Sequence, residues 1–196
     1  MILFLARHAE SVLNLEGRVN GDPSVPAPLT ERGRDQAALL GAQLARVGLD
    51  LCVHTRFPRT KETAELAIGA LDVPAEIEPL LDDIKIGELD GEPLAAYRDA
   101  KRELGRKLPF PGGESLDDAA RRYAEAFGRL SEAGARRVLV VCHEIPIRYA
   151  LNAASGSDQL DGPPFHDVGN AVPFAFDGDV LARAAERIAR LAARPT

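Results

Sequence analysis

Residues 2–11 read ILFLARHAES, a short apolar run that ends directly in an arginine and a histidine. A continuous apolar run of this length, bounded by polar residues, is typical of a strand buried on both faces of a parallel sheet. LDLCVH at residues 49–54 and RVLVVC at residues 137–142 have the same form. These three runs predict the central strands of a largely parallel sheet.

Weaker patterns surround the three runs. Residues 171–176 read AVPFAF, in which Pro173 favours an edge strand or a bulge because it lacks a backbone donor, and residues 76–79 can add a short strand. Helical periodicity lies between the strands. The predicted helices cover residues 31–47, 59–70, 93–104, 116–133, 146–154 and 179–193. Strands that alternate with helices predict an α/β fold.

We expect residues 1–196 to form a single domain. Residues 16–28 and 82–114 are the long irregular stretches, and such loops are commonly functional in compact domains. Residues 82–114 are interpreted as a small lid. The apolar stripe of the final helix, residues 179–193, predicts docking on the same domain, with a homodimer contact as the alternative.

The composition limits the classes of partner. The net charge of −6 argues against nucleic-acid or membrane-surface binding, since both favour a basic protein face. No stretch approaches the roughly 18 consecutive apolar residues of a membrane span, and the first apolar run is too short for a secretory signal. Cys52 and Cys142 lie in predicted strands, which favours reduced core thiols. The prediction is a cytoplasmic protein.

Polar side chains follow each of the three central strands. Arg7 and His8 end the first strand, Thr55 leads from the second towards Arg59, and His143 follows the third. Because parallel strands present their carboxyl ends at one edge of a sheet, we expect these side chains to converge. Guanidinium groups pair with phosphate oxygens, and an imidazole can attack a phosphoryl group. The sequence therefore predicts a phosphoryl site.

Such chemistry also needs a group that gives a proton to the leaving oxygen. The carboxylates available near the predicted site are Asp82, Asp83, Glu88 and Glu144, and spacing alone does not choose among them. Zinc is disfavoured, because it takes neutral histidines with cysteine or carboxylate ligands and adjacent guanidinium groups repel a cation.

Six stretches in chain order resemble the histidine phosphatase superfamily, in its phosphoglycerate-mutase-like branch. RHAES at residues 7–11, followed by Asn14, is similar to the family pattern RHGESxxN. TRFPRTKETA at residues 55–64 is similar to S-x-x-x-R-A-x-x-T-A, and VVCHEIPIR at residues 140–148 to V-S-H-G-G-x-I-R. The other stretches are PLTERGRDQA, PGGESLDDAARR and NAVPF, at residues 28–37, 111–122 and 170–174. The resemblance implies a three-layer α/β/α sandwich with a mostly parallel central sheet and a small lid insertion.

The resemblance also implies roles for the matched residues. His8 would be the nucleophile that becomes phosphorylated. Arg7, Asn14, Arg59 and His143 would bind the phosphoryl group, and His143 would also take part in catalysis. No metal ion or organic cofactor would be needed.

The proton donor stays open between two carboxylates. Asp83 is favoured, because in DIKIGELDG it stands where the family has a glutamate four residues before a glycine. Glu144 is the rival, since another branch of the superfamily places its acid directly after the second histidine. Arg18 and Asn20 are candidates for reading the substrate beyond its phosphate. His54 and His166 are interpreted as structural or surface residues.

These expectations predict a metal-independent phosphomonoesterase that hydrolyses a small phosphorylated metabolite through a phosphohistidine at His8. A cofactor-dependent phosphoglycerate mutase is one alternative, for which the lid is short and lacks a basic insertion. A module that binds phosphate esters without turnover is another. The expected partner is a small-molecule phosphate ester, and the sequence does not name it.

Overall fold

A five-stranded sheet, in the order β3-β2-β4-β1-β5, forms the centre of the computed structural model, which describes residues 1–69, 71–165 and 167–194. The strands are β1 (Ile2–Arg7), β2 (Leu51–His54), β3 (Ala75–Ile77), β4 (Arg137–Cys142) and β5 (Pro173–Asp177). Strands β1 to β4 run parallel, and β5 pairs antiparallel with β1 at the edge. Pro173 thus lies in an edge strand, as its missing donor predicts.

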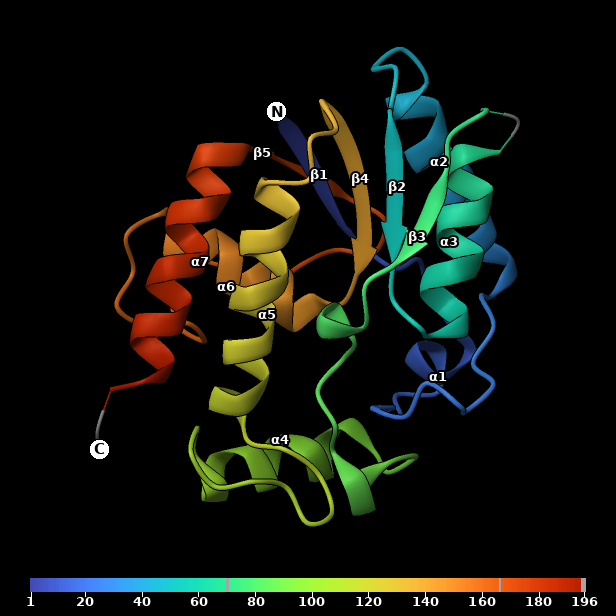
Figure 1. Ribbon diagram of the computed structural model, residues 1–196. Coiled ribbons are helices and arrows are strands. Elements are labelled where there is room, and N and C mark those ends of the chain that lie inside the picture. The colour runs from blue at the N-terminus through green and yellow to red at the C-terminus, as the bar shows by residue number, and fades with distance from the viewer. Residues whose placement is uncertain (70, 166, 195–196) are drawn as a thin grey trace.

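Helices cover both faces of this sheet (Figure 1). One layer contains α2 (Glu31–Leu44) and α3 (Pro58–Ile68), and the other contains α5 (Leu116–Ser131), α6 (Glu144–Ala154) and α7 (Gly178–Ala192). Side chains alternate between the two faces of β4, so Val138 and Val140 join the core under α5 while Leu139 and Val141 join the core under α2. The predicted three-layer α/β/α sandwich is confirmed.

The remaining helices lie at the carboxyl end of the sheet. The short α1 (Val12–Leu15) follows β1, and α4 (Leu94–Leu104) lies in the predicted lid, beyond the tips of the strand arrows in Figure 1. Ser11 and Asn14 form a capping box at α1, so Ser11 has a helix-start role. A 3₁₀ turn at Pro79–Leu81 leads into the lid, and another at Gly87–Leu89 lies within it.

Arg122 of α5 fixes both ends of the lid. Its guanidinium donates to the carbonyl oxygens of Leu80 at 2.8 Å, Asp82 at 2.6 Å and Asp83 at 2.9 Å. It also pairs with the Glu114 carboxylate at 2.5 Å. One largely buried cation therefore holds the chain where it enters the lid and where it leaves it.

Helix α7 uses its apolar stripe within the chain. Its buried residues pack against α5 and α6, and they include Leu181, Ala184, Ala185, Ile188 and Leu191. Docking on the same domain is therefore confirmed, and a homodimer contact stays a prediction. No helix in the described part of the chain combines the length and apolar character needed to span a bilayer.

Candidate active site

The carboxyl ends of β1 and β4 open into a cavity of about 690 Å³ that the lid covers on its far side. The parallel register pairs Arg7 with Cys142, so His8 and His143 leave adjacent strands at the same level. The backbone N–H of His8 donates to the Cys142 carbonyl at 2.9 Å, and the two imidazole centroids lie 5.5 Å apart. The predicted convergence of the two histidines is confirmed.

His8 presents one ring nitrogen to the cavity. Nδ1 lies 2.8 Å from the Ala9 carbonyl oxygen, which only an N–H can satisfy, so the proton of the neutral ring resides on Nδ1. Nε2 consequently carries a lone pair and accepts from Arg59 Nε at 3.0 Å. Burial, with the charges of Arg59 and Arg7, holds the pKa of His8 well below its usual value. His8 is therefore neutral near neutral pH, with the lone pair of Nε2 directed at Arg59.

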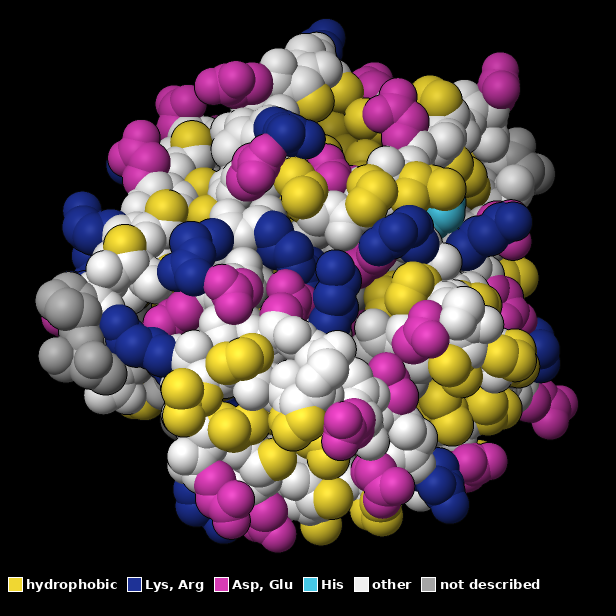
Figure 2. Space-filling model, turned by 60° about the horizontal axis from the view of Figure 1, so that its bottom comes forward, with side chains coloured by type: hydrophobic (Ala, Val, Ile, Leu, Met, Phe, Trp, Pro, Cys, Tyr) yellow, Lys and Arg dark blue, Asp and Glu magenta, His cyan; other side chains and the backbone are white. Residues whose placement is uncertain are grey.

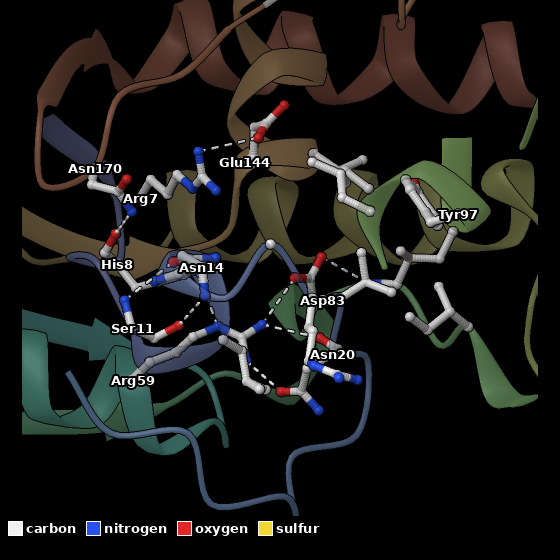
Figure 3. Close-up of a pocket in the computed structure, with 18 of the residues that line it drawn as sticks. Arg7, His8, Ser11, Asn14, Asn20, Arg59, Asp83, Tyr97, Glu144 and Asn170 are labelled. Carbon is white, nitrogen blue, oxygen red and sulfur yellow. Dashed lines mark hydrogen bonds and ion pairs between the residues drawn. The ribbon is translucent and has the colours of Figure 1, made fainter. Parts of the chain in front are cut away.

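Arg59 stands in the first turn of α3, directly after Pro58, and its side chain is almost fully buried. Besides Nε at His8, its Nη1 donates to Asn20 Oδ1 at 2.5 Å and its Nη2 to Asp83 Oδ2 at 3.0 Å. The guanidinium also lies 4.3 Å over the ring of Phe57. Contacts on every edge fix this cation at the base of the cavity (Figure 3).

His143 is fully buried and is held from behind by two hydroxyl groups. Its Nε2 lies 2.9 Å from Thr55 Oγ1, which lies 2.8 Å from Thr60 Oγ1. Thr60 can donate in turn to the Phe57 carbonyl at 2.8 Å. Because both hydroxyls can rotate, Thr55 can accept a proton from Nε2 or give one to it. The pair can therefore satisfy His143 in either protonation state.

The other ring nitrogen of His143 faces Arg59 and Asp83, which line the cavity, while His143 itself lies behind them and is not among the lining residues. Nδ1 lies 3.3 Å from both Arg59 Nη2 and Asp83 Oδ2. Burial, together with the charge of Arg59, holds the pKa of His143 well below its usual value. A bound phosphoryl dianion would oppose this effect, because it favours the protonated ring.

The two candidate acids occupy different environments. Burial raises the pKa of Asp83 above its ordinary value, although Arg59 acts in the opposite direction. Glu144 instead pairs with Arg7 at 3.1 Å and with Arg148 at 2.9 Å. Figure 3 shows Glu144 beside Arg7 and Asp83 beside Arg59 and Asn20. Of the other sequence candidates, Asp82 is bound by Arg56 at 2.6 Å and does not line the cavity.

Arg7 and Asn14 both line the cavity, as the sequence predicts. Arg7 Nη1 donates to the Val168 carbonyl at 3.0 Å, and its buried Nε has no hydrogen-bond partner among the described residues. Asn14 accepts from the Ser11 backbone N–H through Oδ1 at 3.2 Å. Both residues thus keep an N–H group that a ligand oxygen could accept from.

The two substrate-loop candidates reach the cavity in different ways. Asn20 is buried, and its side-chain oxygen holds Arg59, while its amide nitrogen donates to the Asp22 carbonyl at 2.9 Å. Arg18 is half exposed and donates to the Gly91 carbonyl of the lid at 2.6 Å. Asn20 therefore positions the guanidinium of Arg59, whereas Arg18 ties the loop to the lid.

Several cavity residues were not singled out from the sequence. Asn170 donates through Nδ2 to the His8 carbonyl at 2.8 Å and so holds the end of β1. Its place in the NAVPF stretch was the available signal. On the lid, Leu94, Tyr97, Arg98 and Lys101 all line the cavity. Their spacing of i, i+3, i+4 and i+7 marks one helical face, which the sequence shows.

The other two histidines lie apart from this chemistry. His54 is buried at the end of β2, and its Nδ1 lies 2.7 Å from the Thr55 carbonyl oxygen, so it is structural as expected. His166 lies outside the described residues. Within residues 1–69, 71–165 and 167–194, no three His, Cys, Asp or Glu side chains are grouped to hold a metal ion.

Comparison with known proteins identifies relatives of this arrangement. Residues 3–172 match the family described as the histidine phosphatase superfamily, branch 1. The human 6-phosphofructo-2-kinase/fructose-2,6-bisphosphatase 4 is 34% identical over 190 residues, which cover 89% of this chain. The chain spans 38% of the length of that relative.

Two further similarities cover most of both chains. The 2,3-bisphosphoglycerate-dependent phosphoglycerate mutase 2 of Gloeobacter violaceus is 35% identical over 164 residues, which are 76% of this chain and 74% of the mutase. The crystal structure of a putative alpha-ribazole-5'-P phosphatase from Escherichia coli superposes with a TM-score of 0.78, at 26% identity and 89% coverage of each chain.

Proposed function

The chain belongs to the histidine phosphatase superfamily, branch 1, and from this membership and its site we propose that it is a metal-independent phosphomonoesterase of small phosphorylated metabolites. The observation that carries the proposal is the state of His8. A neutral imidazole with its lone pair on Nε2 lies 3.0 Å from a buried guanidinium. This arrangement offers a nucleophile and an anion-binding group to the same phosphoryl group.

In the first step, His8 Nε2 forms a bond to phosphorus while the bond from phosphorus to the ester oxygen breaks. Before substrate binds, the lone pair of Nε2 is engaged by Arg59. A phosphoryl oxygen is a stronger, charge-assisted acceptor for the guanidinium than a neutral imidazole is. Substrate binding would therefore draw Arg59 away from Nε2 and free the nucleophile.

The leaving oxygen takes its proton from Asp83. A carboxylic acid is a useful donor only if it keeps its proton near the working pH, and burial shifts the pKa of Asp83 in that direction. Glu144 lies apart from Asp83 and is engaged by two arginines, Arg7 at 3.1 Å and Arg148 at 2.9 Å. Glu144 would instead hold Arg7 at the phosphate.

Hydrolysis of the phosphohistidine completes the cycle. Water attacks phosphorus, the bond from phosphorus to Nε2 breaks, and the electron pair returns to His8. Asp83, now a carboxylate, accepts the proton that the water loses. Arg7, Arg59 and His143 stabilise the charge on the transferring oxygens in both steps. The side chains named here supply the nucleophile, the proton and the positive charge for each step, so no step needs a metal ion.

Turnover of p-nitrophenyl phosphate tests this proposal. We expect the purified protein to release phosphate in the presence of a chelator, and the His8→Ala variant to lose this activity. Asn20→Ala, which removes a partner of Arg59 and not the nucleophile, should retain measurable turnover. Full activity of His8→Ala, or activity that depends on added divalent metal, would contradict the proposal.

Phosphoglycerate mutase activity is the second candidate, and the similarity to the Gloeobacter mutase favours it. In that reaction the phosphohistidine would give its phosphoryl group to a hydroxyl of the substrate instead of to water. Isomerisation of 3-phosphoglycerate that requires 2,3-bisphosphoglycerate would establish it. Release of inorganic phosphate without isomerisation would exclude it, and binding without either reaction would indicate a module without turnover.

We also propose a cytoplasmic location. Cys52 and Cys142 are both buried and both free, and burial raises the pKa of the Cys52 thiol to about 12. Such protonated thiols are inert core residues. They fit a reducing compartment, and fractionation of the native cells would test the proposal.

A further inference from the structure

The cavity extends well beyond the phosphoryl site. Tyr97 lies at the end of the cavity away from His8, across the space that the lid covers (Figure 3). A volume of about 690 Å³ is at the scale of a whole metabolite and not of a phosphate ion alone. The residues at this second end therefore face the part of a substrate that the phosphoryl site does not hold.

Cationic side chains gather around this end. Arg98 and Lys101 of α4 and Arg148 of α6 line the cavity in addition to the arginines of the phosphoryl site. Figure 2, which turns the lower end of Figure 1 forward, shows Lys and Arg side chains in a band across this face. This local cationic band stands out in a chain whose net charge is −6.

Asp161 positions two of these cations from outside the cavity. Its Oδ1 accepts from Lys101 Nζ at 2.8 Å and from Arg148 Nη2 at 3.1 Å, while its Oδ2 pairs with Arg106. Burial alone would raise the pKa of Asp161, but Lys101, Arg106 and Arg148 hold it below its ordinary value. Arg106 also pairs with Asp117, and Arg148 with Glu144, both at 2.9 Å. Because Glu144 is shared with Arg7, four cations face three carboxylates here, and Arg98 of the lid adds a further positive charge. Asp161 also fixes the lid helix against α6.

The hydroxyl of Tyr97 is the independent sign of a missing ligand. It is buried and has no hydrogen-bond partner in the part of the chain that the structure describes. A buried donor without an acceptor carries a desolvation cost, so such groups are expected to find a partner. Tyr97 lines the cavity beside Arg98 on the same helical face. An anionic oxygen placed there would accept from both.

We propose that Tyr97, Arg98, Lys101 and Arg148 form a second anion subsite, so that the substrate is a phosphomonoester that carries a second acidic group. The inference rests on the proposed function, since it assumes that the phosphoryl group is held at His8. The second group is a carboxylate or a phosphate, which the same cations and hydroxyl recognise.

Matched substrates test the subsite. Glycerol 3-phosphate has a single acidic group, 3-phosphoglycerate adds a carboxylate, and fructose 1,6-bisphosphate adds a phosphate. We expect kcat/KM to be at least about tenfold higher for one of the two-anion esters, since a hydrogen bond to a charged group is worth roughly that factor. The better of the two identifies the acidic group.

Variants locate the effect. Tyr97→Phe leaves no buried group unsatisfied, so the fold should hold, and Arg98 is exposed, so Arg98→Gln should also fold. Each should raise KM for the preferred two-anion ester about tenfold, with kcat and the kinetics of glycerol 3-phosphate nearly unchanged. Arg102→Gln is the matched control, because Arg102 lies on the same helix, pairs with Asp99 at 3.0 Å and does not line the cavity.

Two results would overturn the subsite. One is equal kcat/KM for the one-anion and two-anion esters in the unchanged protein. The other is an equal effect of Tyr97→Phe or Arg98→Gln on both classes of ester. If the protein hydrolyses none of the esters, the proposed function fails instead. Calorimetric binding of the same esters to His8→Ala then supports the subsite if the two-anion ester binds more tightly, and overturns it if the esters bind equally.

Discussion

Replacing Asp83 by asparagine removes the acid from the reacting end of the cavity with little change in shape. The carboxamide oxygen can still accept from Arg59 Nη2, which lies 3.0 Å from Oδ2, so phosphate binding and the fold should be retained. General acid catalysis contributes roughly 100- to 10,000-fold, which is about 3 to 6 kcal/mol of transition-state stabilisation. We expect a loss of this size in kcat/KM for an alkyl phosphate such as glycerol 3-phosphate.

The leaving group separates an acid from a merely structural residue. The p-nitrophenolate ion leaves readily without a proton, so Asp83→Asn should slow hydrolysis of p-nitrophenyl phosphate much less than hydrolysis of glycerol 3-phosphate. The pH profile gives a second readout. Since Asp83 must be protonated, kcat/KM for the alkyl ester should fall as the pH rises through its raised pKa, and Asp83→Asn should lose this limb.

Glu144→Gln is the matched control for this experiment. Glu144 is partly exposed, with 29% of its side chain accessible, and it pairs with Arg7 and Arg148. A pair of this kind is worth up to about 1 kcal/mol, so the loss should stay within roughly fivefold for both esters. If Asp83→Asn keeps full turnover of the alkyl ester while Glu144→Gln loses it, the assignment of the acid is wrong.

Three further perturbations follow from the same contacts. Thr55→Val removes the hydroxyl at His143 Nε2 and should lower kcat about fivefold or more, since a typical hydrogen bond contributes about 1 kcal/mol. Thr55→Ser keeps a hydroxyl and should restore kcat, whereas unchanged kcat in Thr55→Val would refute this role. His8 and His143 have pKa values held below 6.5, so the unfolded chain binds more protons than the folded protein below that pH. The free energy of unfolding should therefore decrease as the pH falls from about 7.5 to about 5.5, and should decrease less in His8→Asn. A denaturation midpoint independent of pH would contradict this. Arg122→Met removes the donor that both ends of the lid share and should lower the free energy of unfolding by about 3 kcal/mol, as measured by urea denaturation. An unchanged denaturation midpoint would show that these contacts of Arg122 do not stabilise the fold.

The convergence of the histidines and arginines of the proposed phosphoryl site was predictable because these residues follow strand ends. Arg7, His8 and His143 come directly after the apolar runs that form β1 and β4, and parallel pairing brings such positions to one edge. Arg59 sits one turn further on, where Pro58 starts α3. In these places a local pattern in the sequence determines the position of the side chain in space.

Side-chain partners across loops were less predictable. Asn20 lines the cavity, and its contact with substrate stays a prediction, but its hydrogen bond with Arg59 at 2.5 Å could not be read from the spacing of the sequence. Glu144 follows His143 in sequence, yet it begins α6, and its side chain reaches Arg148 one turn later and Arg7 on the neighbouring strand. These contacts depend on the direction of each side chain after packing, which spacing along the chain does not specify.

In the lid, the sequence pattern already indicated which residues share the helical face that lines the cavity. The amphipathic spacing of Tyr97, Arg98 and Lys101 follows from helical geometry alone. The face of α4 that meets the cavity became clear only with the ion pair between Lys101 and Asp161, 60 residues apart in the chain. The lid, although short, thus contributes Arg98 and Lys101 as cations to the cavity wall.

Trapping of the covalent intermediate tests the central claim most directly. The protein is mixed with p-nitrophenyl phosphate, quenched in alkali during turnover, digested and analysed by mass spectrometry. The geometry of His8 Nε2 predicts a phosphoryl group on His8 and on no other residue, and its absence from His8→Ala. Steady turnover without phosphorylated His8, or a phosphoryl group on another side chain, would contradict the proposed mechanism.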